Sequence, residues 1–94
     1  MKRTLYEIML LPNDELILTA TQDEYRFCIV TRAQEMPKVL SEYSLAEVIS
    51  VRSLSDWDES CTARVQWLCS LMPGYAMRHV ETACGIHHAE LQKS

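Results

Sequence analysis

Residues 4–32 read TLYEIMLLPNDELILTATQDEYRFCIVTR, and this stretch decides the expected fold. It holds three runs in which apolar and polar residues alternate, separated by the polar breaks Pro12–Asp14 and Gln22–Glu24. Alternation with a period of two, in runs rich in β-branched and aromatic residues, predicts strands, and Pro, Asn and Asp favour turns between them. We therefore expect a three-stranded antiparallel β-meander over about residues 4–32.

Residues 33–54 carry mixed patterns. Pro37 is suited to the first turn of a short helix that would reach Tyr43. The sequence from Ser44 to Glu47 matches a capping box, which would start another helical segment. Residues 48–51, Val-Ile-Ser-Val, nevertheless read as a strand. We expect helix running into a short strand or loop, and the sequence does not separate helix from strand here.

Residues 55–72 have the features of an amphipathic helix. Ser55 is a good N-cap, and acidic residues fill the turn that follows it, where the helix dipole favours them. Apolar residues then recur at helical spacing: Trp57, Cys61, Val65, Leu68 and Met72. The pattern predicts a helix over about residues 56–72 that ends at Pro73 and Gly74.

Helical spacing also continues beyond Gly74, through Met77, Val80, Cys84, His87 and Leu91. This periodicity predicts a second helix over about residues 75–92, unless Gly85 breaks it. A chain of 94 residues has room for one core only. The expected architecture is therefore a single α+β domain, residues 1–94, in which two C-terminal helices pack against the meander.

The composition narrows the classes of function. Lys and Arg total 9 against 13 Asp and Glu, which gives a net charge of −4. Neither half of the chain is basic, so we expect no nucleic-acid partner. The only two glycines are Gly74 and Gly85, whereas phosphate-binding loops, dinucleotide fingerprints and nucleophile elbows all need glycine-rich turns. We therefore expect no enzyme and no cofactor.

The apolar run at the N-terminus is short and interrupted by Glu7 and Pro12, unlike a secretory signal or a membrane span. We therefore expect a cytoplasmic protein with no membrane association. The chain has four cysteines and no CxxC pair. In a reducing compartment these cysteines are expected to be free thiols that pack as small apolar residues.

One motif suggests a different function. Residues 80–86 read VETACGI and are followed by Leu91. The apolar and small residues are placed around the glycine as in a helix-turn-helix unit, which this segment resembles, and in which the glycine turns the chain between two helices. The resemblance implies a DNA-binding regulator that uses residues 76–93. We rank this function second, because its expected reading face has no excess of basic residues.

The same segment holds a thiol and two imidazoles. Cys84 precedes His87 by three residues and His88 by four, and Glu81 precedes Cys84 by three. On a helix such groups share one face, and all of these residue types bind zinc. A metal or thiol site built from Cys84, His88, His87 and Glu81 is therefore the third candidate. The spacing matches no established zinc signature, so our leading expectation is no metal site and no catalytic residue.

The leading expectation is a surface that binds another protein. Trp67 lies off the apolar stripe of the 56–72 helix, and aromatic residues at such positions, like Tyr75 near a segment end, often anchor interfaces. Asp56, Asp58 and Glu59 cluster at the start of the same helix. We therefore expect these five residues to bind a protein partner that has a basic surface.

In size and composition the chain resembles the short accessory proteins of phages and other mobile elements. These include inhibitors of host defence, such as anti-CRISPR proteins, and immunity proteins. The expected function is accordingly that of a small, acidic, non-enzymatic binding protein or inhibitor. The sequence is also compatible with a homodimer.

Overall fold

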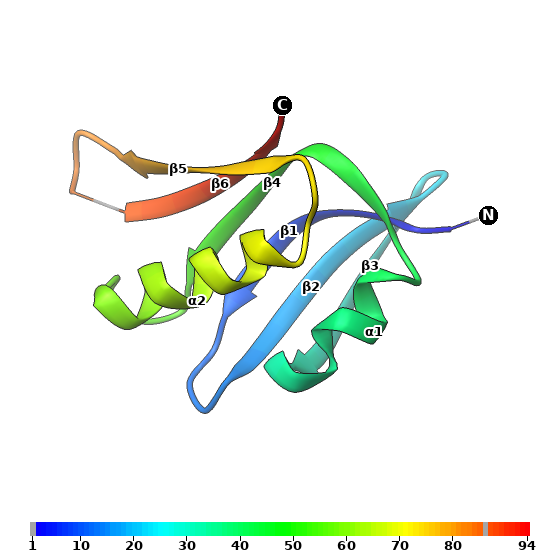
Figure 1. The fold of residues 1–94 in the computed structure, drawn as a ribbon, viewed down its shortest axis with the longest axis horizontal. Coiled ribbons are helices and arrows are strands. Elements are labelled where there is room, and N and C mark those ends of the chain that lie inside the picture. Colours follow the sequence, from blue (N-terminus) through cyan, green and yellow to red (C-terminus); the bar gives the residue numbers. More distant parts are fainter. Residues whose placement is uncertain (1, 86) are drawn as a thin grey trace.

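The computed structural model describes residues 2–85 and 87–94 and shows one mixed sheet of six strands with two helices on one of its faces (Figure 1). The strands lie in the order β3-β2-β1-β4-β6-β5. In chain order the elements are β1 (Thr4–Leu10), β2 (Glu15–Gln22), β3 (Tyr25–Arg32), the 3₁₀ turn η1 (Ala33–Glu35), α1 (Met36–Leu40), β4 (Ser44–Ser53), α2 (Glu59–Ser70), β5 (Tyr75–Glu81) and β6 (His87–Lys93).

The expected fold class, a three-stranded meander packed by two C-terminal helices, is wrong. Strands β1, β2 and β3 are joined by antiparallel pairing, but they form only half of the sheet. Strand β4 lies parallel to β1 and extends the sheet on its other side, and β6 and β5 follow by antiparallel pairing. The sequence pattern of a strand does not indicate which strands pair with it. The prediction was therefore limited to strands that short turns join.

The expected helix over residues 75–92 is a β-hairpin, β5 and β6. The apolar residues of this segment fit the spacing of a helix and also the alternation of a strand. In the hairpin, Met77 and Leu91 are cross-strand partners on the face that meets the core. Gly85, at φ 78°, lies in the turn, where its amide donates to the Thr82 carbonyl (2.9 Å). The segment forms strands and not a helix because β6 pairs with β4. This pairing satisfies backbone N–H and C=O groups of both strands.

The segment over residues 33–54 also differs from expectation in part. Pro37 does lie in the first turn of a helix, α1, but this helix ends at Leu40. The apparent capping box at Ser44 is instead the start of β4, a strand of 10 residues. Residues 44–47 become strand because they continue the parallel ladder with β1, in which Ser44 pairs with Thr4.

Helix α2 is shorter than the expected 56–72. Its N-cap is Asp58, not Ser55, and the Asp58 carboxylate accepts a hydrogen bond from the Cys61 amide (3.1 Å). Asp58 has an extended backbone, so the chain enters the helix one turn later than the first good capping residue suggested. Helix α2 ends at Ser70, and Gly74 at φ 84° turns the chain into β5.

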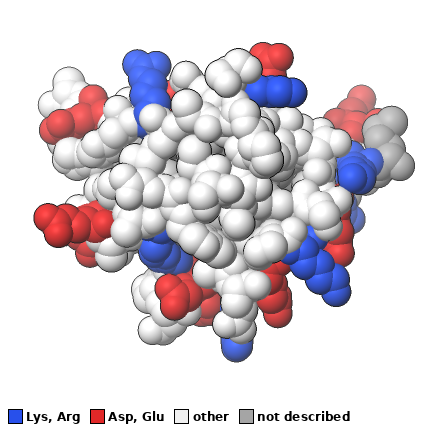
Figure 2. Space-filling view, viewed as in Figure 1, with Lys and Arg blue, Asp and Glu red and all other residues white. Residues whose placement is uncertain are grey.

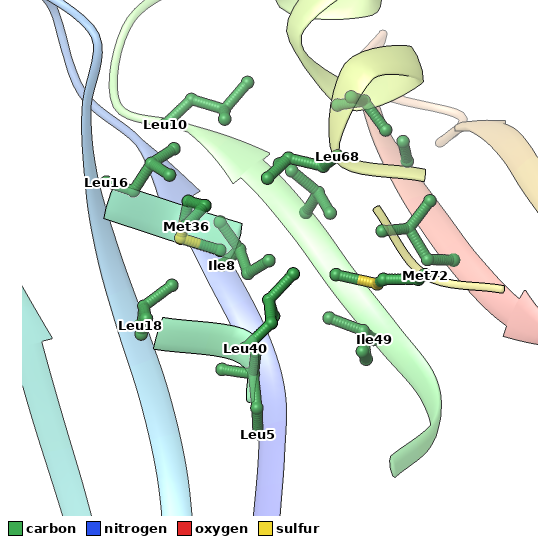
Figure 3. Close-up of a cluster of buried hydrophobic side chains, with 14 of the residues drawn as sticks. Leu5, Ile8, Leu10, Leu16, Leu18, Met36, Leu40, Ile49, Leu68 and Met72 are labelled. Atoms are coloured by element: carbon green, nitrogen blue, oxygen red, sulfur yellow. The ribbon is translucent and has the colours of Figure 1, made fainter. Parts of the chain in front are cut away.

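The core lies between the sheet and the two helices (Figure 3). An irregularity at Tyr6 shifts the register of β1, so that Leu5 and Ile8 both face the core although strict alternation would separate them. The largest fully buried side chains come from all of these layers: Leu5, Ile8, Leu10, Leu16, Leu18, Met36, Ile49, Leu68, Met72, Leu91, Val51 and Val65. Within the described ranges the opposite face of the sheet carries no helix (Figure 1).

Over the described ranges, 2–85 and 87–94, no helix has both the length and the apolar character needed to cross a membrane.

Candidate functional site

A largely apolar hollow on the helix side lies between α2 and the segment that joins β3 to α1. It has a volume of about 380 Å³. Its lining comes from three distant parts of the chain and is called the α2 groove below: Asp14, Leu16, Ala33, Gln34, Ala63, Arg64, Trp67 and Leu68. In the view of Figure 2 charged side chains lie mainly around the rim, and the middle of the surface is largely uncharged.

Trp67 is the main exposed aromatic residue of the groove. It lies in the second half of α2 and 39% of its surface is exposed, whereas the next residue, Leu68, is 1% exposed and belongs to the core. Helical geometry explains this contrast, because adjacent residues point about 100° apart and only one of them can face the sheet. Trp67 was predicted to lie off the apolar stripe, and its exposure agrees with that position.

Arg64 holds the floor of the groove in place. Its Nη1 donates to the Leu11 carbonyl (2.8 Å) and its Nη2 donates to the Glu15 carbonyl (2.9 Å). These carbonyls flank the β1–β2 turn, in which Asn13 and Asp14 both have φ 61°. Hydrogen bonds from a charged donor are stronger than neutral ones, so the guanidinium fixes this turn against α2. Arg64 is thereby engaged internally and is poorly placed to receive an anionic ligand.

The groove continues towards the start of α2. A second hollow of about 410 Å³ shares Asp14, Ala63 and Arg64 with it and extends to Ser55 and Asp58. The Asp14 carboxylate is exposed and has no partner among the described residues. The extended groove therefore presents an apolar end at Trp67 and an acidic end near Asp58.

The predicted acidic residues have different tasks. The carboxylate of Asp58 caps α2 and also accepts a hydrogen bond from the Ser60 hydroxyl. These hydrogen bonds, that of Ser60 first, lower the pKa of Asp58 below its usual value of 3.8. Asp56 and Glu59 are exposed beside this cap, so the structure does bring the three acids together at one end of α2.

Tyr75 is a structural residue in this fold. It is half-buried at the start of β5, and its hydroxyl donates to the Ala46 carbonyl (2.6 Å). Burial, and secondly the carboxylate of Glu47, raise the pKa of the Tyr75 phenol. Tyr75 does not line the α2 groove, so the structure does not place it with Trp67.

The proposed metal or thiol cluster is not assembled. Cys84 lies in the exposed turn between β5 and β6, whereas His87 and His88 are successive residues of β6 and point to opposite faces of the sheet. Glu81 pairs with His87, and their side chains lie 3.7 Å apart (Oε1 to Nε2). Among residues 2–85 and 87–94 no group of three or more His, Cys, Asp or Glu side chains is arranged to hold a metal ion.

His87 instead belongs to an aromatic stack. The ring of Trp57 lies on His79 with centroids 5.7 Å apart, and His79 lies on His87 at 5.4 Å. Trp57 Nε1 donates to the Thr62 hydroxyl (3.0 Å), which ties the stack to the first turn of α2. The Nδ1 atom of His87 is buried and has no partner among the described residues. The stack thus joins the start of α2 to the β5–β6 hairpin.

The helix-turn-helix expectation over residues 76–93 is wrong, because these residues form the two strands β5 and β6. Ile86, which completes that motif, lies outside the described residues. The four cysteines form no disulfide in the structure. The expectation that they pack as small apolar residues holds for the buried Cys61, but it is wrong for Cys28 and Cys84, which are exposed.

Comparisons with protein-family models, with curated proteins and with solved structures found no match for this chain. The geometry described above is therefore the basis for a functional proposal. Sequence reasoning identified Trp67 and the acidic start of α2. It missed Asp14, Leu16, Ala33, Gln34 and Arg64, because nothing in the sequence relates the β1–β2 turn to the middle of α2.

Proposed function

We propose that the protein is a non-enzymatic binding protein whose α2 groove receives a segment of another protein. The observation that carries this proposal is the exposure of Trp67 beside an apolar hollow. Interfaces concentrate their binding energy on a few large side chains in sheltered pockets, and tryptophan is among the commonest of these. A bulky apolar side chain of the partner would pack against Trp67 in the groove.

The acidic end of the groove, near Asp58, favours a partner that carries positive charge. Asp14 and Asp58 line it, and the exposed Asp56 and Glu59 lie beside Asp58 in the chain. Arg64, by contrast, is engaged by two carbonyl groups. Lys or Arg residues next to the bulky side chain of the partner would meet this acidic end. Binding of this kind, on a basic surface of another protein, would block that surface, which is the mode of action of an inhibitor or an immunity protein.

The proposal can be tested with random peptides displayed on phage and selected on the immobilised protein. We expect the selected peptides to combine a bulky apolar residue with nearby Lys or Arg. Trp67→Ala should weaken their binding roughly ten-fold or more, and Asp14→Asn should weaken it by a smaller factor. Gln66→Ala is the matched control, because Gln66 is an exposed neighbour on α2 that does not line the groove.

Two results would reject the proposal. One is selection of peptides that bind Trp67→Ala as well as the unchanged protein. The other is selection of acidic peptides, since these would oppose the charge of the groove. Circular dichroism of each variant establishes that a loss of binding does not come from unfolding.

A further inference from the structure

Strand β3 forms one edge of the sheet, and of the usual features that protect an edge it carries only charged side chains, Arg26 and Arg32. It pairs with β2 through an uninterrupted register from Glu15↔Arg32 to Gln22↔Tyr25. Natural edge strands are commonly blunted by Pro, Lys, a bulge or a covering loop. Strand β3 reads YRFCIVTR, with no Pro, Gly or Lys, and its register has no bulge. Its outer side is therefore suited to pairing with another strand.

The hairpin register determines which backbone groups face outward. Gln22 and Tyr25 close a two-residue turn, and such a closing pair is hydrogen-bonded. Hydrogen-bonded and non-hydrogen-bonded pairs then alternate along an antiparallel ladder, so alternate residues from Tyr25 onward bond to β2. The intervening residues, Arg26, Cys28 and Val30, direct their N–H and C=O groups away from the sheet. No backbone hydrogen bond is made to these outward groups within the described part of the chain.

The opposite edge of the sheet is a useful comparison. On β5 the exposed positions include Arg78, His79 and Glu81, which are charged or polar. On β3 Arg26 and Arg32 are exposed as well, but beside two large apolar side chains, Tyr25 at 70% and Val30 at 60%. Apolar and β-branched residues stabilise strand pairing, whereas a solvated charged edge resists it. The edge at β3 is thus the better one for association.

We propose that β3 pairs with β3 of a second copy of this chain, antiparallel, about a twofold axis at Cys28. The two six-stranded sheets would then form one continuous sheet. This inference is independent of the α2 groove and concerns a different surface. An isologous contact of this kind closes on itself and gives a dimer, not a fibre.

Charge favours this register over the one with its axis at Ile29. With the axis at Cys28, Arg26 of one copy lies opposite Val30 of the other, and Glu24, in the turn that precedes β3, comes next to Arg32 beyond each end of the ladder. With the axis at Ile29, Arg26 would lie directly opposite Arg32, and like charges opposite each other are unfavourable. An axis midway between Cys28 and Ile29 would place the outward-facing backbone groups of one copy opposite backbone groups of the other copy that already bond to β2.

The other face of the ladder agrees with this register. Phe27 and Ile29 are half-buried at the margin of the core, and the axis at Cys28 sets Phe27 of each copy opposite Ile29 of the other. Aromatic and β-branched pairs of this kind are favourable across strands. The Cys28 thiol lies on the open face beside the Thr19 hydroxyl (3.8 Å between Sγ and Oγ1), so the two Cys28 thiols would face each other across the axis.

The first test is the molar mass in solution, measured by light scattering or sedimentation over a concentration series. We expect a mass that rises towards twice the 10.9 kDa of one chain. Glu24→Arg and Arg32→Glu should each weaken the dimer roughly three- to thirty-fold, because either change brings like charges next to each other beyond both ends of the ladder. The double variant restores both pairs with exchanged signs and should recover the affinity, which a merely structural role of these residues would not produce.

The second test uses the thiols, in a Cys84→Ser background that leaves Cys28 as the exposed cysteine. A short bis-maleimide should link two chains, and the added change Cys28→Ser should abolish the link. A monomeric mass at the highest concentration, no link despite complete labelling of Cys28, or a double variant as weak as the single ones would each overturn the proposal. Trp67→Ala should leave the mass unchanged, which separates this proposal from that of the groove.

Discussion

The two tryptophans near the ends of α2 are used in opposite ways. Trp57 precedes the helix, donates a hydrogen bond to Thr62 and begins a stack with two histidines. Trp67 lies in the last turns of the helix, 39% exposed, and its indole has no partner among the described residues. One tryptophan is occupied within the molecule, and the other presents a large apolar surface to solvent.

This difference separates a stabilising residue from one that is available for recognition. A side chain with its polar atom satisfied and its ring stacked contributes to folding, whereas an exposed ring beside a hollow contributes little. If this distinction is right, substitution of Trp57 should mainly lower the free energy of unfolding. Substitution of Trp67 should mainly weaken peptide binding. The predictions below run from the largest expected change in stability to the smallest.

Leu68→Ala should have the largest effect. Leu68 is 1% exposed between α2 and the sheet, so its truncation leaves a cavity and lowers the free energy of unfolding by about 2–4 kcal/mol. Urea denaturation measures the change. A loss below about 0.5 kcal/mol would contradict the packing of α2 on the sheet, and with it the comparison of the tryptophans.

Trp57→Ala should cost roughly 2–3 kcal/mol, somewhat less than truncation of a fully buried tryptophan, because Trp57 is half-buried. Trp57→Phe keeps a ring for the stack but removes the Nε1 donor, and should cost about 1 kcal/mol. Both are measured by urea denaturation at neutral pH. Equal losses for the two variants would mean that the hydrogen bond, and not the packing of the ring, carries the effect.

Asp58→Asn tests the cap beside Trp57. Asparagine can still cap a helix, but it does not titrate. Because the folded-state pKa of Asp58 is lowered, its ionised form stabilises the fold above the unfolded-state pKa, and this contribution is lost as the pH falls through the folded-state value. The unchanged protein should therefore be more stable than the variant at neutral pH, and the gap should narrow below about pH 4. A gap that is constant with pH would contradict this assignment.

Trp67→Ala should have the smallest effect on stability, below about 1 kcal/mol, because the residue is already 39% exposed and its indole has no hydrogen-bond partner among the described residues. Its effect on peptide binding should be the largest of the four positions. The pair Trp57→Ala and Trp67→Ala thus forms a crossed test in which stability and binding change in opposite order. A large loss of stability for Trp67→Ala would show that this ring also serves the fold.

The sequence predicted those parts of the molecule whose structure depends on local pattern. Strands β1, β2 and β3 and helix α2 follow from alternation and helical spacing within one segment. The hairpin of β5 and β6 did not, because Met77 and Leu91 fit both periods and only the partner strand β4 decides between them. Propensity is a weak guide where long-range pairing competes with it.

The candidate site was predictable only in fragments. Trp67 is found from its position off the apolar stripe, and the acids at the start of α2 from helix-capping rules. The floor of the groove depends on two hydrogen bonds from Arg64 to Leu11 and Glu15, residues more than forty positions away. No local pattern encodes such contacts, so the groove itself required the fold.

The parallel pairing of β1 with β4 has a consequence for how the chain reaches its native state. Thr4 pairs with Ser44 and Leu10 with Ser53, so the centre of the sheet joins residues about forty positions apart. Strand β6 must then enter between β4 and β5. Closing such long loops is entropically costly before their contacts form, and topologies rich in distant contacts fold slowly for their length. The local β1–β2–β3 hairpins should therefore form early, and the rate-limiting step in refolding should be the docking of β4 beside β1.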